Sequence, residues 1–365
     1  MSIPTHIAGT FVIHADASFL NGAGLGEGED RNVTIPKTLR DGRNRVPYVS
    51  SQAWKRWLRS TLIAETGWPA SELRSIKESE KQTTSKIAGE LNPVDFAEDD
   101  LFGYMRAQEG QGKRKKSEET EGEEEAGATK TKDDAIKTKA LMRSSPFSAS
   151  LLVSIRKTGW QGRDEGFVHL KEGTPLPYTT EFYTAHMQGI FCLAHYRVGF
   201  FSNEGDRVEI DEALAKKALA DGRVLQRDGG FEVADAEASR RQRSSALLKA
   251  LSVLRGGAKQ AAFGTDVAPK CLILAGLSCG NPVFNHLFED DNEKGLSLRI
   301  SVFRELLADY ADRIVTPVAV GIRTSYLANE EDVRKLAGIQ ETARGKVEVV
   351  VTTPREAAEL IASKL

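Results

Sequence analysis

The segment Tyr48-Val-Ser-Ser-Gln-Ala-Trp-Lys-Arg-Trp-Leu-Arg59 contains the start signals of a helix. Ser50 or Ser51 is a natural N-cap, because a serine hydroxyl accepts a hydrogen bond from one of the first helix amides. Gly67, with Pro69 just beyond it, predicts the end of the helix, since glycine adopts the left-handed cap conformation and proline cannot continue the helix. We therefore expect a helix that ends near residue 67.

This helix is expected to have one packed face and one cationic face, because its side chains repeat every 3.6 residues. The packed face consists of Trp54, Trp57, Leu58, Thr61 and Leu62. The other face consists of Lys55, Arg56, Arg59 and Ile63. Free amides, the positive end of the helix dipole and two hydroxyls coincide at the helix start, which suits a phosphate backbone. The alternative is an ordinary solvated face.

The net charge does not by itself indicate a nucleic-acid-binding protein, because the formal charges of the 365 residues sum to -2. Any basic surface must therefore be local. The connecting segment 33–48 supplies such a concentration just ahead of the helix, with Lys37, Arg40, Arg43 and Arg45. The glycine-rich loop 21–28 permits close backbone approach to a ligand, but no Gly-Lys-Ser/Thr follows it as in a P-loop.

Composition predicts a globular protein with a substantial core, at 40% hydrophobic and 28% charged residues. Cys192, Cys271 and Cys279 form no C-x-x-C pair, so we expect free thiols in a reducing cytosol and no metal site. No secretory signal pattern is present, and no window reaches the roughly 18 apolar residues that span a membrane. A cytoplasmic protein without a membrane partner is expected.

Strands and helices alternate along the chain, which predicts an α+β or α/β sandwich around one sheet. The first strand is expected over 7–20, and the strongest over 189–201, where both registers are apolar and a central position follows. A long helix is predicted over 236–255, followed by a strand over 271–277. The C-terminal third is expected to contain a helix at 296–310, a strand at 315–322, a helix at 330–336, a strand at 347–353 and a helix at 354–364.

Residues 108–134 are the plainest low-complexity segment. Four cations at 113–116 precede a run of glutamates, and no large apolar residue accompanies them. Such a segment buries too little apolar surface to offset the conformational entropy that it would lose on ordering. We therefore expect a disordered surface insertion within one domain. The acidic and aromatic unit 95–105 permits a metal-binding or acid/base role, although its Leu-Phe-Gly-Tyr run favours packing.

No catalytic constellation is recognisable. The six histidines show no H-E-x-x-H or H-x-H spacing, and nucleophile-elbow, Rossmann and Walker motifs are absent. His195 is expected to be a core or sheet-face histidine. One catalytic alternative remains, in which Glu27, Glu29 or Asp30 of the glycine loop assists a metal-dependent cleavage of a nucleic-acid backbone. No cofactor is predicted.

With these residues in view, the sequence resembles the backbone subunit of type I CRISPR Cascade complexes, a member of the RAMP superfamily, in the DevR-like branch of subtype I-B. The resemblance extends to about Phe284. It rests on Asn21-Gly22, Pro47-Tyr-Val-Ser-Ser-Gln-Ala-Trp-Lys-Arg56, Asp99-Asp-Leu-Phe-Gly-Tyr104, Thr174-Pro-Leu-Pro-Tyr178 and Gly256-Gly-Ala-Lys259.

The resemblance implies a single α+β domain over 1–365, with a modified RNA-recognition-motif or ferredoxin-like core sheet. It also implies a helical, finger-like insertion at 60–107 and a thumb-like insertion at 156–188. Copies of such a subunit stack along a guide crRNA, displace a base at regular intervals, and assemble with other Cascade subunits. The guide pairs with target DNA, and a recruited nuclease-helicase cuts, so the subunit itself is not an enzyme.

By the same resemblance, residues of the central segment and two loops contact guide phosphates or sugars. These residues are Asn21, Gly22, Arg45, Ser50, Ser51, Gln52, Lys55, Arg56, Arg59 and Lys259. A guide-binding subunit must accept any guide sequence, which favours phosphate and shape contacts that leave base edges free. The first strand lacks the aromatic pair that stacks bases in ordinary RNA-recognition motifs.

Two alternatives remain open. A type III-like backbone subunit would cleave target RNA with a metal ion and a loop acid, for which Asp30 is the candidate. An α/β metabolic enzyme would need a pocket constellation that the sequence does not show.

Overall fold

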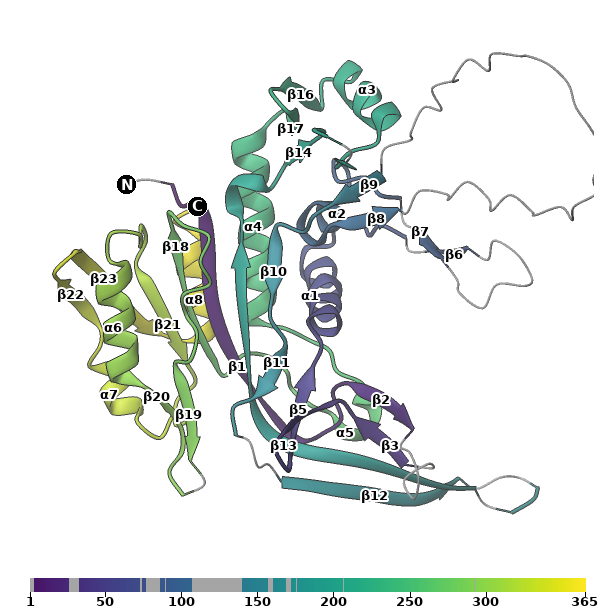
Figure 1. Ribbon diagram of the computed structural model, residues 1–365, viewed down its shortest axis with the longest axis vertical. Helices are drawn as coiled ribbons and strands as arrows, with labels where there is room; N and C mark the ends of the chain where they lie inside the picture. Colours follow the sequence, from purple (N-terminus) through teal and green to yellow (C-terminus); the bar gives the residue numbers. More distant parts are fainter. Residues whose placement is uncertain are drawn as a thin grey trace, which may run out of the picture.

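The computed structural model describes residues 3–25, 33–72, 74–76, 86–88, 90–106, 140–156, 160–168, 172–174, 176–205, 207–291 and 293–365. The helices are α1 (Ser51–Thr66), α2 (Ala97–Phe102), α3 (Glu212–Ala220), α4 (Ala236–Ser252), α5 (Gln260–Phe263), α6 (Ile300–Tyr310), α7 (Glu330–Arg334) and α8 (Pro354–Ala362), with a 3₁₀ helix at His195–Arg197. Mixed helices and strands confirm the predicted α+β class (Figure 1).

The described strands form one large sheet and four small ones. The strands of the large sheet are β1 (His6–Ser18), β2 (Gly22–Leu25), β3 (Val33–Pro36), β4 (Thr38–Asp41), β5 (Asn44–Val49), β10 (Phe147–Ala149), β11 (Leu152–Ser154), β12 (Trp160–Val168), β13 (Leu176–Leu193), β18 (Cys271–Leu277), β21 (Val318–Ile322), β22 (Gly338–Thr342) and β23 (Gly345–Thr352). The small sheets consist of β6 (Arg74–Ile76), β7 (Lys86–Ala88), β8 (Tyr104–Arg106), β9 (Ala140–Arg143), β14 (Phe200–Ser202), β15 (Arg207–Val208), β16 (Val224–Arg227), β17 (Gly230–Val233), β19 (Phe288–Asp291) and β20 (Gly295–Leu298).

Strand β1 is the centre of the large sheet, where it pairs antiparallel with β13 on one edge and β18 on the other. Because side chains alternate along a strand, β1 contributes to two separate cores. Ile7 and Phe11 pack in the core that includes α1, α4 and α8. Ala8 and Val12 pack in the core that includes α6 and α7. The sheet is therefore covered by helices on both faces, as Figure 1 shows.

The predicted central strand at 189–201 is correct in position but wrong in extent. Strand β13 begins at Leu176 and ends at Leu193. A 3₁₀ helix follows, and Gly199, in the turn after that helix, has a φ of 78°, outside the β region. His195 therefore lies in a buried 3₁₀ turn rather than in the strand, where its Nδ1 shares a 2.8 Å hydrogen bond with Ser244 Oγ.

Helix α1 confirms the predicted signals at both ends. Ser50 is the N-cap, and its Oγ accepts from the Ala53 amide at 3.4 Å. Gly67 is the left-handed C-cap, with φ 67°. Trp54 is fully buried, stacks edge-on against Phe11 at a centroid distance of 5.2 Å and donates its indole N–H to a backbone carbonyl. The tryptophan thus attaches α1 to the central strand.

The C-terminal third has the predicted element types with shifted boundaries. Helix α6 begins at Ile300 rather than at residue 296, because Gly295–Leu298 pairs with Phe288–Asp291 in a hairpin. Helix α4 ends at Ser252, three residues before the predicted end. Periodicity indicates the type of an element better than the residue at which it ends.

The three predicted insertions are described to different extents. Within the described residues of segment 60–107, the end of α1 and α2 are helical, and the other elements are short strands. The charged segment 108–134 lies outside the described residues. The segment 156–188 contains an antiparallel hairpin of β12 and β13 that extends from the body (Figure 1), and its second strand continues into the sheet centre.

Helix α2 is tied to its surroundings by buried charge. Asp100 is fully buried, and its carboxylate accepts from the guanidinium groups of Arg143 and Arg243 and from the Gly199 amide. The Arg143 guanidinium also bonds Glu209 at 2.8 Å. Because removing one partner of a buried ion pair costs about 3–5 kcal/mol, these contacts hold α2, β9 and α4 in one arrangement.

Acid is expected to weaken the fold through His195. Burial, followed by the charges of Arg240 and Arg241, lowers the pKa of His195 from 6.5 to about 4. Because the folded state resists protonation, this contribution to stability is complete above pH 6.5 and is lost as the pH falls toward 4. We expect His195→Gln to remove up to about 3 kcal/mol of the pH dependence of unfolding between pH 7 and pH 4. Denaturant titrations at several pH values measure it, and parallel curves for the two proteins would contradict it.

Candidate nucleic-acid interface

The start of α1 presents free donors. The Ser50 amide donates to Asn21 Oδ1 at 3.0 Å, so the side chain of Asn21 fixes the N-cap residue. The amides of Ser51 and Gln52 have no acceptor among the residues that the structure describes. No acidic residue occupies the first turn of α1. The positive end of the helix is therefore open to an anion.

The loop 256–259 lies against the end of β1, close to this helix start. The Ala258 amide donates to the Leu20 carbonyl at 2.9 Å, one residue before Asn21. Lys259 Nζ lies 5.3 Å from the ring centre of Phe19 and donates to Thr180 Oγ1 of β13 at 2.6 Å. The loop brings a cation from the far end of α4 to the region where β1, β13 and α1 meet.

A glycine makes this approach possible. Gly256 has a φ of 156°, and a Cβ there would lie inside the van der Waals surface of the Trp57 indole. Arg255, the preceding residue, donates its amide to Thr61 Oγ1 at 3.1 Å. The backbone after α4 therefore packs directly on α1, which a side chain at residue 256 would prevent.

The three cations predicted on α1 lie in different environments. Arg56 is exposed and bonded to no acceptor within the described part of the chain. Lys55 is partly buried, bonds Ser145 Oγ at 3.3 Å, and has a pKa below its usual value because burial disfavours its charge. Arg59 is paired with Glu98 at 2.5 Å and lies 3.6 Å from Asp99. Arg56 is thus the cation of this face most available to a ligand.

The basic connecting segment 33–48 contains β3, β4 and most of β5, and β5 and β4 end the sheet path. Arg40 and Arg45 are direct cross-strand partners. Like charges in such a pair repel, and Glu181 offsets part of this by bonding Arg45 at 3.0 Å. Arg163 of β12 also pairs with Glu181, at 3.3 Å. Arg45 and Arg163 therefore share one carboxylate.

The structure thus brings most of the predicted residues to one region, through contacts that the sequence did not indicate. Gly22 opens β2, next to the ring of Phe19. Four side chains were not predicted to belong to this region, because each contacts a predicted residue that is distant in the sequence. They are Phe19, Thr180, Glu98 and Glu181. Asp30 lies outside the described residues. The acids of the 95–105 unit bind arginines rather than standing free for catalysis.

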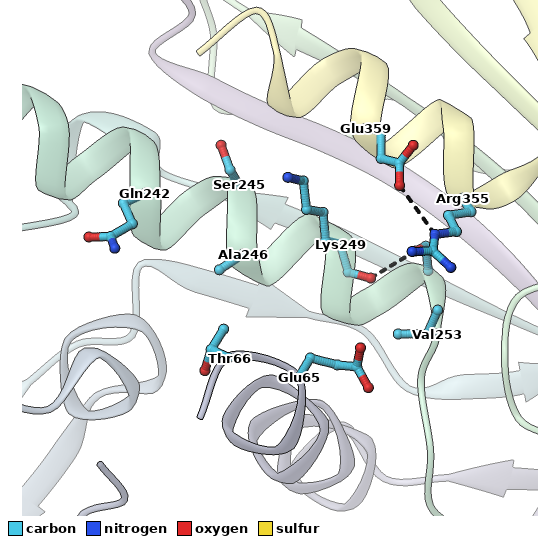
Figure 2. A pocket seen from close by; sticks show the side chains of 10 residues that line it. Glu65, Thr66, Gln242, Ser245, Ala246, Lys249, Val253, Arg355 and Glu359 are labelled. Carbon is cyan, nitrogen blue, oxygen red and sulfur yellow. Dashed lines mark hydrogen bonds and ion pairs between the residues drawn. The ribbon is translucent and has the colours of Figure 1, made fainter. Parts of the chain in front are cut away.

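A separate cavity of about 440 Å³ lies between the end of α1, α4 and α8 (Figure 2). Its charged lining is mixed, since Glu65 and Glu359 occur together with Lys249 and Arg355. Arg355 is bonded to Glu359 at 3.2 Å. This pairing makes the cavity a poor site for a polyanion. Among the described residues, no grouping of three or more His, Cys, Asp or Glu side chains is arranged to hold a metal ion.

Comparisons with known proteins bear on the fold. No protein-family model and no curated protein matches the sequence. The structure resembles a chain of a CRISPR RNA-guided surveillance complex, pre-nicking, with a TM-score of 0.54 and 13% identity over 99% of this chain and all of that one. A chain of a second CRISPR RNA-guided surveillance complex aligns with a TM-score of 0.49 at the same identity and coverage. The first alignment shows a shared fold.

The described helices include none that is both long and apolar enough to cross a membrane.

Substitution of Gly256 should be far more costly than substitution of a nearby glycine with open surroundings. Gly256→Ala places a methyl group in the Trp57 ring, and we expect a loss of about 3 kcal/mol. Gly264→Ala is the matched control, because Gly264 also has a positive φ, 59°, but no atom within 4 Å of its added Cβ. Its expected cost is about 1 kcal/mol. Denaturant unfolding of both variants measures the difference, and equal losses would refute the packing argument.

Proposed function

We propose that this chain is a guide-binding backbone subunit of a CRISPR surveillance complex of the Cascade type. The observation that carries the proposal is the open start of α1, where, among the described residues, the amides of Ser51 and Gln52 have no acceptor and Arg56 has no ion-pair partner. Lys259 lies beside the same region through its contact with Phe19. The fold shared with a chain of an RNA-guided surveillance complex supports the same conclusion.

In this proposal, the subunit holds the backbone of guide crRNA and leaves the bases free to pair with target DNA. Amides, hydroxyls and cations recognise phosphates and sugars without reading sequence, as a subunit that accepts any guide requires. We assign an RNA-recognition-motif-like palm to part of the large sheet and the helices on one of its faces. This palm consists of the antiparallel strands β18, β1 and β13 with α4 and α8. The β12–β13 hairpin is the proposed thumb.

The proposed partners follow from this role. Copies of the chain polymerise along the guide and assemble with other Cascade subunits in the cytoplasm, in a subtype I-B-like system for antiviral defence. The chain is proposed to be non-catalytic, and cleavage belongs to a recruited nuclease-helicase. No cofactor is required.

RNA recovered with the protein from its native host tests the role directly. We expect short RNAs of one length class that carry a common repeat-derived end, because a backbone subunit protects a guide of defined length. Sequencing of the co-purified nucleic acid is the measurement. Random cellular RNA, or none, would overturn the proposal. RNA that is cut with Mg²⁺ and spared by Asp30→Ala would favour the type III-like alternative.

Neutralising Arg56 should weaken RNA binding in a salt-dependent way. A charge-assisted contact contributes about 1.5 kcal/mol, so we expect Arg56→Gln to bind single-stranded RNA about tenfold more weakly at low salt. The slope of log K against log salt should decrease by about 0.7, because one fewer counterion is released. Fluorescence anisotropy over a range of salt concentrations measures both values.

The matched control is Arg344→Gln, which removes an exposed cation from the turn between β22 and β23, at the opposite end of the sheet path from β4. We expect this variant to bind RNA with the affinity and slope of the natural protein. An equal effect of the two substitutions would show that overall charge, rather than the α1 face, determines binding.

A further inference from the structure

Helix α2 carries three consecutive buried carboxylates, and two of them neutralise a cation of the proposed RNA-binding face. Glu98 and Asp99 are 2% and 3% exposed, and both lie beside Arg59. The Arg59 Nε donates to Glu98 Oε2 at 2.5 Å, and Nη2 lies 3.6 Å from Asp99 Oδ1. One cation therefore meets two acids, and the group of three side chains carries a net negative charge.

Backbone donors hold these carboxylates in place. Glu98 Oε1 accepts from the Ser71 amide, and Asp99 Oδ2 accepts from the Asn92 amide at 3.1 Å. Because the backbone anchors both acids, they cannot follow Arg59 outward toward a ligand. The Arg59 side chain is only 19% exposed. An incoming phosphate would have to break the ion pair and approach two fixed negative charges.

Two depressions that Arg56 and Arg59 both line differ in charge. One, of about 240 Å³, is lined by Gln52, Lys55, Arg56, Arg59, Phe102 and Gly103, and none of its described lining residues is a carboxylate. The other, of about 380 Å³, is lined by Arg56, Arg59, Ser60, Ile63, Ala70, Ser71 and Glu98. A phosphate is favoured in the first, beside Lys55, and opposed in the second by Glu98.

We propose that Glu98 and Asp99 are positioning residues that end the phosphate track at Arg56 by withholding Arg59 from the guide backbone. The inference rests on the proposed function and specifies the residue of α1 at which the contact with RNA ends. Arg59, expected from the sequence to contact RNA, instead joins α1 to α2. The acids of α2 thereby determine which cations of α1 the RNA meets.

Releasing Arg59 should add one phosphate contact. In Glu98→Gln, the amide still accepts a hydrogen bond but no longer holds the charge, so Arg59 becomes available. We expect the salt slope for a uridine homopolymer to steepen by about 0.7, with affinity rising about threefold or more at low salt. The gain should disappear in the Glu98→Gln/Arg59→Gln double variant. A purely structural role of Glu98 would not move the slope in this way.

Two further variants sharpen the test. Glu65→Gln is the charge-matched control, because Glu65 lies on α1 itself and pairs with Arg255 rather than with Arg59. Its slope should stay that of the natural protein. If thermal unfolding shows that Glu98→Gln does not fold, Asp99→Asn is a second variant that weakens the hold of α2 on Arg59. Equal steepening by Glu65→Gln would assign the effect to general charge and overturn the proposal.

Nuclear magnetic resonance of the Arg59 Nε–H separates this proposal from the proposed function. In the free natural protein the proton should exchange slowly, and in Glu98→Gln it should exchange at least tenfold faster. When RNA is added to the natural protein, slow exchange should persist. Rapid exchange in the free protein, or a slope decrease in Arg59→Gln equal to that of Arg56→Gln, would overturn the positioning role. Slow exchange without any RNA binding would instead overturn the proposed function.

Discussion

The burial of β1 on both faces and both edges is the constraint on which the rest of the structure depends. Its side chains enter two cores, and its backbone is paired with β13 and β18. A strand held in this way leaves no freedom for the residues that follow it, so Leu20 and Asn21 occupy defined positions. Asn21 then fixes the Ser50 amide at the N-cap of α1, and Leu20 anchors the loop of Lys259. The pairing and burial of β1 at the centre of the sheet therefore determine the geometry of the candidate interface.

Charge in this protein is organised by pairing rather than by excess. A net charge of -2 is compatible with a local cationic surface, because many acids are neutralised internally. Glu98, Asp99 and Asp100 illustrate the point, since they bind arginines of α1, β9 and α4. At the start of α1, Arg56 remains exposed and is bonded to no acceptor among the described residues. The helix dipole and the amides of Ser51 and Gln52, which have no described acceptor, add to the positive potential there.

The same pairing explains why the number of cations on a helix face in the sequence exceeds the number that are free to bind a ligand. Lys55, Arg56 and Arg59 occupy one face of the helix, yet only Arg56 is exposed and unpaired within the described residues. The hydrophobic period predicts which side of α1 is packed, and it does so correctly for Trp54 and Leu58. It contains no information about acids that approach from another helix. Buried ion pairs across elements are where local pattern and tertiary structure differ most.

The sequence by itself determined the features that depend on neighbouring residues. These are the alternation of helices and strands, the caps of α1 at Ser50 and Gly67 and its packed face, because capping and periodicity act within a few residues. Tertiary structure alone decided the extent of β13, the turn that holds His195, and the pairing of Arg59 and Arg45 with acids remote in the chain. It also decided the approach of Gly256 to Trp57 and of Lys259 to Phe19. The physical reason is that these contacts join residues separated by tens to hundreds of positions, and only the packed sheet and its helices bring them together.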